Sequence, residues 1–429
     1  MRTHWDAIVV GGGAAGLWAA GTSAERGKRV LVLEKNNKAG VKILMSGGTR
    51  CNITHHCDNR KIAEAFGKNG RVLLSVLQRL SPDDVVRRFE EEGVATKVES
   101  TGKVFPVSDR AIDVRDAVVR RLTRFGAELI CGCAVQQVAP DPENGGFRIN
   151  AKTKDIELNL QTKTVLITTG GLSYSGCGTT GDGYAWVQAM GHTVTPLRPA
   201  LTPLTSNASW VHELSGLTLE DVVVRADVFE REGEGLSERG KPLKLERRES
   251  RGGFLWTHTG CSGPTSMNVS RCFSDLEPGD PMELCVDLLP GESVPALEGW
   301  ITQEARVSNR AISTVLGLKI PKRLAQSILE RCGAVYDPHL AELPKGIRNK
   351  ILENLKQYRI PITGTLGYPK AEVTAGGVSL GEVNFQDMQS RKQPGLFLAG
   401  EILDLDGPIG GFNFQAAWST GHTAGLHLG

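Results

Sequence analysis

The apolar and polar positions of the first forty residues follow a clear pattern. Apolar residues at 7–10 predict a buried strand, and a second apolar run at 30–33 predicts another. Between them, Gly11-x-Gly13-x-x-Gly16 turns the first strand into a helix that begins near Ala14. We therefore expect a strand–helix–strand unit at the start of the chain.

Helical and strand patterns alternate from residue 72 to residue 195. Ser81 has the position of a helix N-cap, with Pro82 in the first turn. Cys131 and Cys133 fall on one face of a predicted strand, which favours small core residues over a redox pair. The expected helices are 72–80, 82–92, 113–125 and one from Asp182, and the expected strands are 127–135, 164–171 and a hairpin of 146–151 with 156–160.

The composition changes at residues 196–203, which marks a domain boundary. Beyond it we expect a β-rich piece with a small helical insertion, and such an insertion would cover a bound ligand and define the substrate pocket. The chain then returns to the first domain. The main segments are strands at 221–229 and 282–288, helices from Pro321 and at 347–355, a strand at 395–401 and a helix opened by Gly410 and Gly411.

Length and composition describe an ordinary globular protein. The chain has 429 residues, too many for one core, so two or three domains are expected. No apolar run reaches the roughly 18 residues that span a bilayer, and residues 1–6 do not resemble a signal peptide. Nine cysteines, an odd number, suit a reducing compartment. We therefore expect a cytoplasmic protein without membrane contact.

The balance of charged residues indicates whether a nucleic-acid partner is expected. The 50 basic and 48 acidic residues give a net charge of +2, so we expect no nucleic-acid partner. Cys51, His55, His56 and Cys57 have metal-ligand chemistry, but structural zinc sites repeat short Cys pairs, and this chain has no CxxC. We expect no metal, and the sequence does not determine an oligomeric state.

The glycines of the first turn predict a dinucleotide site. Gly11 permits the tight turn, Gly13 lets a pyrophosphate approach, and Gly16 lets helix and strand pack closely. The positive end of the helix then faces the phosphates. Glu34, at the end of the second strand, is placed to accept from ribose hydroxyls, which favours FAD or NAD over NADP.

Further segments fit the same ligand. Ser46, Gly47 and Gly48 can form a backbone nest, with Lys42 and Arg50 as phosphate donors, and the alternative is a surface loop with two ordinary charges. A second GxGxxG at 176–181 lacks a strand directly before it and an acid after it, so no separate NAD domain is expected. Near the other end of the chain, Glu401 follows a strand and can hold a ribityl chain. The helix after Gly411 can stabilise negative charge at flavin N1 and O2.

Together these segments resemble the two-dinucleotide-binding flavoprotein superfamily. More narrowly, the chain is similar to the bacterial FAD-binding family that includes aminoacetone oxidase and the bile-acid 3-dehydro-4,6-reductase. Its departures are Val41 where an Arg is usual, Thr49 where a Gly is common, and Ser175-Gly-Cys177 in place of a Pro-containing loop. The motifs that carry the resemblance are 9–16, 42–54, 169–174 with 180–184, 257–264, 374–378 and 399–407 with 410–415.

The resemblance implies an α/β fold: a Rossmann-like FAD-binding domain split between the chain ends, an inserted β-barrel-like domain and a small helical domain. The expected divisions are 1–195 and 366–429 for the FAD domain, 196–290 and 341–365 for the β-rich domain, and 291–340 for the helical domain. The cofactor contacts it implies are Gly11, Gly13, Ala15, Gly16, Glu34, Lys35, Lys42, Ser46, Gly48, Arg50, Cys51, Asn52, Val135, Gly170, Gly400, Glu401, Gly411, Phe412 and Asn413. To these we add their motif neighbours Ala14, Gly47, Thr169, Gly171, Asp404 and Gly410.

The expected function is an FAD-dependent oxidoreductase of a small molecule, with hydride passing between substrate and flavin N5. An oxidase of small amines and a reductase of conjugated enones are both compatible, and NAD(P)H is a candidate diffusible electron donor. Candidate catalytic groups are Tyr174, His258 and Cys51. The alternatives are a non-enzymatic flavin-binding or sensor protein and an FAD-dependent tRNA-modifying enzyme. The balanced charge disfavours the second of these.

Overall fold

The computed structural model describes residues 5–229, 244–274, 282–307, 310–334 and 337–429. The chain divides into two compact units, which are described separately. Unit 1 comprises residues 1–199 and 372–429, and unit 2 comprises residues 200–371. The further division of unit 2 into a β-rich and a helical domain stays a prediction.

Unit 1 is built on a parallel sheet. Val9 pairs with Val32 on one side and with Leu166 on the other, so the first strand lies at the centre. The order β21-β9-β1-β2-β6 confirms the predicted Rossmann-like arrangement. Its strands are β1 (Trp5–Val10), β2 (Val30–Glu34), β6 (Glu128–Cys131), β9 (Glu157–Ile167) and β21 (Leu396–Leu398).

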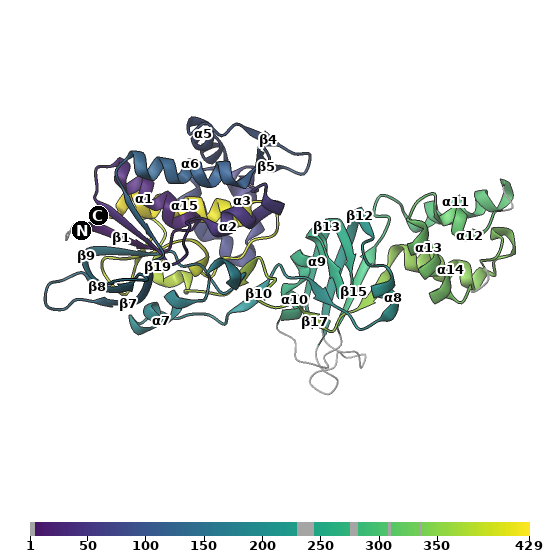
Figure 1. Cartoon of the computed structure of the whole chain (residues 1–429). Helices are drawn as coiled ribbons and strands as arrows, with labels where there is room; N and C mark the ends of the chain where they lie inside the picture. The colour runs from purple at the N-terminus through teal and green to yellow at the C-terminus, as the bar shows by residue number, and fades with distance from the viewer. Residues whose placement is uncertain (1–4, 230–243, 275–281, 308–309, 335–336) are drawn as a thin grey trace. The chain divides into compact units, whose positions relative to one another are not determined.

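Helices α1 (Ala14–Glu25), α6 (Ala111–Arg124) and α15 (Phe412–His427) lie together on one side of this sheet (Figure 1). Two glycines of α15 let it approach α1 closely. A Cβ on Gly421 would lie 2.4 Å from the Ala15 carbonyl oxygen, and one on Gly425 would lie 2.5 Å from that of Ala19. Because only glycine fits there, the two ends of the chain form one packed layer.

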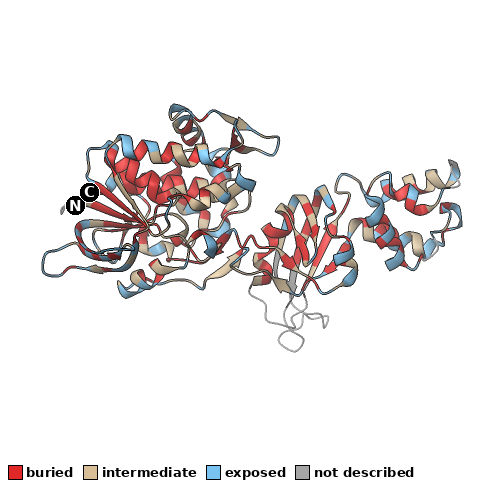
Figure 2. Cartoon of the chain, viewed as in Figure 1, coloured by how far each residue is buried: buried red, intermediate tan, exposed pale blue. Residues whose placement is uncertain are grey.

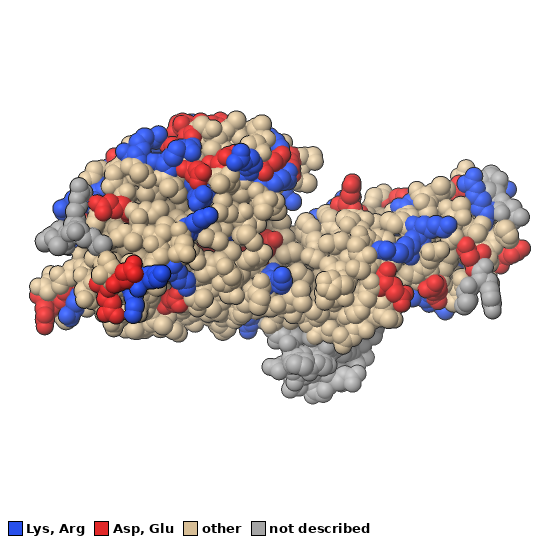
Figure 3. Space-filling view, viewed as in Figure 1, with Lys and Arg blue, Asp and Glu red and all other residues tan. Residues whose placement is uncertain are grey.

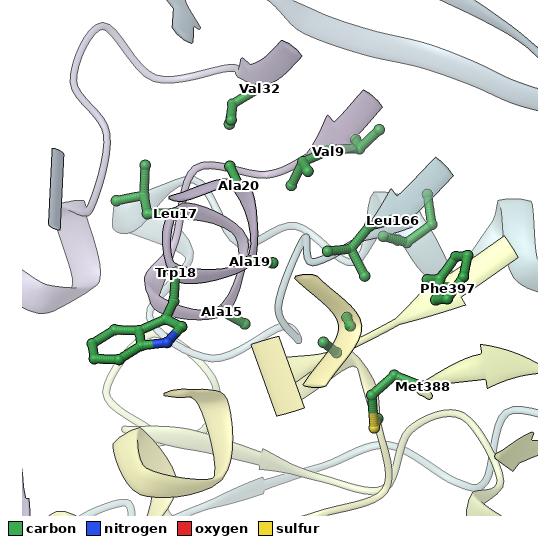
Figure 4. Close-up of a cluster of buried hydrophobic side chains, with 14 of the residues drawn as sticks. Val9, Ala15, Leu17, Trp18, Ala19, Ala20, Val32, Leu166, Met388 and Phe397 are labelled. Carbon is green, nitrogen blue, oxygen red and sulfur yellow. The ribbon is translucent and has the colours of Figure 1, made fainter. Parts of the chain in front are cut away.

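Buried residues fill the strands of both units (Figure 2). In unit 1, Leu17 of α1 and strand residues such as Val9 and Leu166 lie in one cluster of buried side chains (Figure 4). Trp418 of α15 lies 5.2 Å from Trp18 between ring centroids and donates its indole N–H to the Ile53 carbonyl. Strands β1, β2 and β21 are buried on both faces, which explains their continuous apolar runs.

Three local predictions need correction. The predicted strands 156–160 and 164–171 are one strand, β9, because its first half pairs with β8 (Phe147–Lys152) and its second half joins the parallel sheet. The predicted strand 127–135 is broken at Gly132, whose φ is +67°. The predicted helix at 72–80 is shorter, since α4 covers Leu73–Leu77 after a 3-10 turn.

Other elements of unit 1 agree closely with the sequence. The helix after Ser81 has a reciprocal capping box, in which Ser81 accepts from the Asp84 backbone N–H and Asp84 accepts from that of Ser81. The remaining elements are β3 (Thr54–His55), β4 (Thr96–Val98), β5 (Lys103–Pro106), β7 (Ala134–Pro140), β10 (Arg198–Ala200), β18 (Val373–Ala375), β19 (Val383–Asn384), β20 (Gln389–Ser390), α2 (Val41–Met45), α3 (Asn59–Ala65), α5 (Pro82–Glu91), α7 (Asp182–Ala189) and the 3-10 turns η1 (Ser46–Thr49), η2 (Gly67–Val72), η3 (Ser175–Cys177), η5 (Leu380–Glu382) and η6 (Gly400–Ile402).

Unit 2 contains an antiparallel sheet in the order β16-β15-β12-β13-β14-β11-β17. Its two edge strands, β16 and β17, are joined by residues 362 and 363 alone, so the sheet curls back on itself as the barrel-like prediction requires. The strands are β11 (Leu204–Thr205), β12 (Thr218–Phe229), β13 (Lys244–Thr257), β14 (Gly260–Ser262), β15 (Met282–Asp287), β16 (Tyr358–Pro361) and β17 (Gly364–Thr365).

Helical segments complete unit 2. Ile328 of one of them and Val286 of the sheet belong to a common cluster of buried apolar residues. Among the described residues of the whole chain, no helix is both long enough and apolar enough to cross a bilayer. The helices of unit 2 are α8 (Ser209–Glu213), α9 (Pro264–Val269), α10 (Arg271–Ser274), α11 (Val294–Val307), α12 (Ile312–Leu316), α13 (Lys322–Cys332) and α14 (Lys345–Lys356), with the 3-10 turn η4 (Leu340–Glu342).

The Glu382 carboxylate connects the β19–β20 edge of unit 1 with the segment that follows α7. Its carboxylate accepts from the Thr193 backbone N–H at 2.8 Å and pairs with Lys392 at 2.7 Å. Desolvation raises the pKa of Glu382, but the hydrogen bonds from Lys392 and Thr193 outweigh it and lower the pKa from 4.5 to about 2. The carboxylate therefore stabilises the fold above pH 4.5, and this contribution is lost as the pH falls towards 2.

We expect Glu382→Gln to lower the free energy of unfolding at neutral pH. The difference from the wild type should shrink as the pH falls from 4.5 to about 2, because the wild-type carboxylate is protonated there. Urea unfolding across this range measures it. A difference that does not change with pH would contradict the assignment.

Candidate functional site

In the glycine-rich turn between β1 and α1, two glycines are required by close packing, and a third faces free space. A Cβ on Gly16 would lie 2.0 Å from the Gly11 carbonyl oxygen and 2.5 Å from Thr168 Oγ1. Gly11 has a φ of +105° and no room for a Cβ either. Gly13, at the N-cap of α1, has no atom within 4 Å of its Cβ position. A phosphate can therefore approach the backbone at Gly13.

Glu34 is held at the end of β2. Its Oε2 accepts from the Gly12 backbone N–H at 2.7 Å, and its Oε1 accepts from that of Asn36 at 2.8 Å. Each carboxylate oxygen has a second lone pair, so the group still has capacity for ribose hydroxyls.

The segment from Ser46 to Asn52 has an unusual backbone. Gly47 and Gly48 are left-handed, and the non-glycine residues Thr49 and Cys51 also have positive φ values, +69° and +60°. At the two non-glycine residues such conformations cost about 1–3 kcal/mol each, and they concentrate at ligand sites. No atom lies within 4 Å of a Cβ built on Gly48. The segment thus has the open, turned backbone predicted for an anion or flavin edge.

The two predicted phosphate donors of this region are already paired. The Arg50 guanidinium stacks on the Phe105 ring at 3.9 Å and donates to Glu99 and Asp109. Lys42 donates to Glu401 at 2.6 Å and to Ser173 at 3.0 Å. Their contacts with a phosphate stay predictions.

Glu401 is the centre of a polar cluster. Its Oε1 accepts from the Ser173 hydroxyl at 2.7 Å and from the Thr374 backbone N–H at 2.9 Å, while its Oε2 accepts from Lys42. These partners come from α2, the loop after β9 and β18. Glu401 therefore connects three segments that are far apart in the sequence, besides its predicted role at the ribityl chain.

The start of α15 faces β3. Gly411 is the N-cap, with a φ of +93°, and a Cβ there would lie 2.5 Å from the Thr54 carbonyl carbon and oxygen. The His55 ring stacks on Phe412 at 4.6 Å, and its Nδ1 lies 3.0 Å from the Gly410 carbonyl oxygen. Since a carbonyl only accepts, His55 carries its proton on Nδ1. No side chain caps this helix, so its first N–H groups are free for a ligand.

Asn413 and Lys35 are occupied within the protein. Asn413 Oδ1 accepts from the Gly407 N–H at 2.8 Å, and its Nδ2 donates back to the Gly407 carbonyl, which closes the loop before α15. Lys35 pairs with Asp182 at 2.6 Å. Any cofactor contact by these two residues then involves their backbone or apolar atoms, or a rearranged side chain.

Other predicted cofactor residues follow strands β9 and β21 or, in the case of Val135, lie near the start of β7. Gly170 and Gly400 both have positive φ, and a Cβ on Gly400 would lie 2.9 Å from the Ala15 Cβ. Gly171 packs against the Thr374 side chain. Val135 lies in β7, and Asp404 donates its backbone N–H to the Val378 carbonyl. Their cofactor contacts stay predictions.

The residues of this region fit FAD. Asn52 Oδ1 and Thr169 Oγ1 are buried side-chain oxygens that have no hydrogen-bond partner. Buried polar atoms without partners are uncommon in folded proteins. Gly13 and Gly48 leave open space beside the backbone, and α1 and α15 start without a side-chain cap. A pyrophosphate on the start of α1 and a flavin near the start of α15 would use these features.

The candidate catalytic residues lie in different environments. Tyr174 has a φ of +57°, a strained conformation of the kind found at functional sites. His258 belongs to unit 2, in the turn between β13 and β14. Cys51 is fully buried, and burial raises the pKa of its thiol to about 12, although a hydrogen bond with Ser46 opposes this. A thiol with so high a pKa is a poor proton donor.

We expect Cys51 to resist alkylation in the folded protein, because the thiolate is the reactive form. Iodoacetamide at mildly alkaline pH, followed by peptide mass spectrometry, should modify the half-buried Cys57 first and Cys51 only after denaturation. Cys51 labelling as fast as that of Cys57 would contradict this environment.

Among the described residues, no three or more His, Cys, Asp or Glu side chains come together in a way that could hold a metal ion. Sequence reasoning missed two charged residues of this region: Glu372, which interacts with the charge of Lys42, and Lys103, which pairs with His55 across β3 and β5. Glu372 stands two residues before Thr374, just outside the motif at 374–378.

Comparison with known proteins gives the family. The model of the HI0933-like protein Rossmann domain matches residues 5–427. The chain belongs to this family. The match confirms the predicted FAD-binding Rossmann fold, and the protein is an FAD-dependent oxidoreductase.

Two relatives match along almost the whole chain. The ribosomal RNA dihydrouridine synthase of Escherichia coli K12 is 31% identical over 97% of this chain and 96% of its own length. The 3-dehydro-bile acid delta(4,6)-reductase of Clostridium scindens is 29% identical over 97% of each chain. Among solved structures, the 3-ketosteroid delta1-dehydrogenase of Sterolibacterium denitrificans has a TM-score of 0.55 at 13% identity, covering 100% of this chain and 99% of that one, which supports the fold.

Proposed function

We propose that this member of the HI0933-like family is a reductase that saturates a carbon–carbon double bond conjugated with a carbonyl group. The observation that carries the proposal is the chemistry shared by its two full-length relatives. Dihydrouridine is uridine with its 5,6 double bond saturated, and that bond is conjugated with a ring carbonyl. A bile-acid delta(4,6)-reductase, by its name, also acts on double bonds close to an oxidised carbon.

The site is compatible with this reaction. When bound, FAD supplies the hydride. The protein supplies a turned backbone at Gly47 and Gly48, the start of α15 and several charged side chains around Lys42. NAD(P)H is proposed as the diffusible electron donor. No relative named above supports the oxidase of small amines, so the reductase is the better hypothesis.

We propose a small-molecule enone as the substrate, since the chain has nearly equal numbers of acidic and basic residues. On the face drawn in Figure 3, the described Lys and Arg side chains lie interspersed with Asp and Glu. A uridine of ribosomal RNA is the second candidate. The E. coli relative and a Haemophilus influenzae relative of the same name, 30% identical over 100% of this chain, favour it.

The test compares both substrates with one preparation. Purified protein should be yellow and should release FAD on denaturation. The flavin is reduced anaerobically with NADH or NADPH and then mixed with cyclohexenone, with a 3-keto-4-ene steroid or with ribosomal RNA from a strain that lacks the gene. Flavin reoxidation is followed by absorbance, and products are identified by the gain of two hydrogens in mass spectrometry.

Each outcome decides a part of the proposal. Saturated ketone supports the small-molecule substrate, and dihydrouridine in the RNA supports the second candidate. Fast reoxidation by oxygen together with no reaction of any conjugated acceptor would reject the reductase in favour of an oxidase. Colourless protein that cannot be reconstituted with FAD would reject the cofactor.

A further inference from the structure

Two charged side chains near the predicted flavin site have no hydrogen-bond or ion-pair partners among the described residues. Lys103 is the first residue of β5, and Glu372 directly precedes β18. In the part of the chain that the structure describes, neither side chain makes a hydrogen bond or an ion pair. Glu372 is exposed and Lys103 is partly exposed, so both can be reached from solvent.

Strand pairing and a shared hydroxyl place these two residues in one region: Lys103 of β5 pairs with His55 of β3, and the Ser173 hydroxyl contacts both Lys42 and the Glu372 backbone. The Glu372 carboxyl interacts with the charges of Lys42 and Lys103, and Lys103 also interacts with His55. Ser173 Oγ lies 3.0 Å from Lys42 Nζ and 3.5 Å from the Glu372 carbonyl oxygen. Glu372 therefore lies beside the cluster around Glu401, and Lys103 lies beside His55 at the start of α15.

The residues around Lys103 and Glu372 indicate what these two side chains can bind. His55 contacts Gly410 and Phe412, and Lys42 contacts Glu401. These partners are residues expected to border the flavin. Lys42 is held by Glu401 and Ser173, whereas Lys103 and Glu372 are not engaged. A free ammonium and a free carboxyl beside a predicted flavin site are available to a substrate rather than to the fold.

We propose that Glu372 is the proton donor of the reductase and that Lys103 binds the carbonyl oxygen of the substrate. This inference rests on the proposed function. It assigns two residues of unit 1 to the proton donor and to the carbonyl-binding group, which the reaction requires in addition to the hydride.

The step balances as follows. Hydride adds to the alkene carbon remote from the carbonyl, and the electron pair of the double bond moves towards the carbonyl oxygen, where the Lys103 ammonium stabilises the negative charge. The carbon next to the carbonyl then takes a proton from Glu372, so an O–H bond breaks and a C–H bond forms. Water reprotonates the resulting carboxylate, and NAD(P)H returns the two electrons.

The environment of Glu372 suits an acid. Although Glu372 keeps exposed surface, the protein around its carboxyl partly desolvates this group and raises its pKa, while the positive charges of Lys42 and Lys103 oppose the rise. A raised pKa keeps the carboxyl protonated to a higher pH than an ordinary glutamate. Protonation-dependent turnover should therefore decline as the pH rises through this pKa. The charged groups that act on the Glu372 carboxyl are Lys42 and Lys103.

The first test does not depend on turnover. Carbodiimide coupling of a small amine labels protonated carboxyls, and peptide mass spectrometry follows each site against pH in the FAD-loaded protein. Glu372 should label up to a higher pH than Glu64, an exposed glutamate of α3. Lys103→Met should extend Glu372 labelling to a still higher pH, because it removes a charge that lowers the pKa. Labelling of Glu372 that matches Glu64 and ignores Lys103→Met would overturn the proposal.

The second test uses single turnover of the reduced enzyme with cyclohexenone. Glu372→Gln should slow product formation about 100-fold and remove the decline at high pH, and Lys103→Met should chiefly weaken substrate binding. Glu64→Gln is the matched control and should behave as wild type. FAD content and thermal midpoint identify any variant that fails to fold. Glu372→Gln with the rate of Glu64→Gln would reject the donor role.

The two proposals fail in distinguishable ways. If the wild-type enzyme reduces no conjugated double bond, the proposed function is wrong whatever the labelling shows. If the wild type is active and both Glu372→Gln and Lys103→Met are unimpaired, the function stands and the assignment of these two residues is wrong. Activity lost in Tyr174→Phe but kept in Glu372→Gln would give the donor role to Tyr174.

Discussion

Gly16→Ala is expected to destabilise unit 1 by about 3 kcal/mol and to abolish FAD binding. The new Cβ would lie 2.0 Å from the Gly11 carbonyl oxygen and 2.5 Å from Thr168 Oγ1. Both atoms belong to the framework at the carboxyl ends of β1 and β9, so neither can move without disturbing the sheet. Thermal unfolding of the apoprotein and titration with FAD measure the two effects.

Gly13→Ala is the matched control. No atom lies within 4 Å of its Cβ position, so the apoprotein should keep its stability. If a pyrophosphate approaches the backbone there, the added methyl group should weaken FAD binding about ten- to hundredfold. Equal FAD affinities of wild type and Gly13→Ala would contradict the predicted position of the pyrophosphate. A stable Gly16→Ala protein that binds FAD would contradict the packing of the turn.

Glu401→Ala is expected to lower the free energy of unfolding by about 2–3 kcal/mol. The carboxylate accepts hydrogen bonds from the Ser173 hydroxyl, from the Thr374 backbone and from Lys42, and all three donors would lose their partner at once. The Lys42–Glu401 pair is only partly exposed, with side-chain exposures of 29% and 19%, so water replaces these bonds incompletely. Urea unfolding of the apoprotein measures the change.

Two further variants separate the contributions. Glu401→Gln keeps an acceptor for Ser173 and Thr374 but removes the charge, so its loss should be smaller than that of Glu401→Ala. Lys42→Ala completes a double-mutant cycle with Glu401→Ala, and we expect a coupling energy of about 1 kcal/mol between the two residues. Additive effects of the two substitutions would show that the pair does not stabilise the fold.

Local sequence patterns were sufficient to predict the central elements of unit 1. The spacing of Gly11, Gly13 and Gly16 predicts β1, α1 and β2 within a residue or two, because a tight turn and close packing limit what can occupy these positions. Ser81 and Pro82 marked the start of α5 for the same reason, since capping involves neighbours in the chain. The break at Gly132 was not visible, because the strand pattern continued across a glycine whose left-handed backbone only the fold requires.

Contacts between segments that are distant in the sequence could not be predicted from local patterns. Arg50 was expected to bind phosphate, but β4 and β5 bring Phe105 and Glu99 against it. Glu401 was expected to bind the ribityl chain, and the structure adds Ser173 and Thr374 as its partners. No periodicity or short motif records such pairs, because sheet order and helix packing decide which loops meet at the carboxyl ends of the strands.

By itself, the sequence determined the glycine-rich turn, the acid at Glu34, the return of the chain through α15 and, through its motifs, the FAD-binding family. Only the tertiary structure decided which side chains are occupied and which are free. Lys42 and Arg50 are paired, whereas Glu372 is exposed and Lys103 is partly exposed, and neither makes a hydrogen bond or an ion pair through its side chain within the described residues. The reason is physical: backbone turns depend on residues adjacent in the chain, but the availability of a charge depends on partners that folding brings from elsewhere.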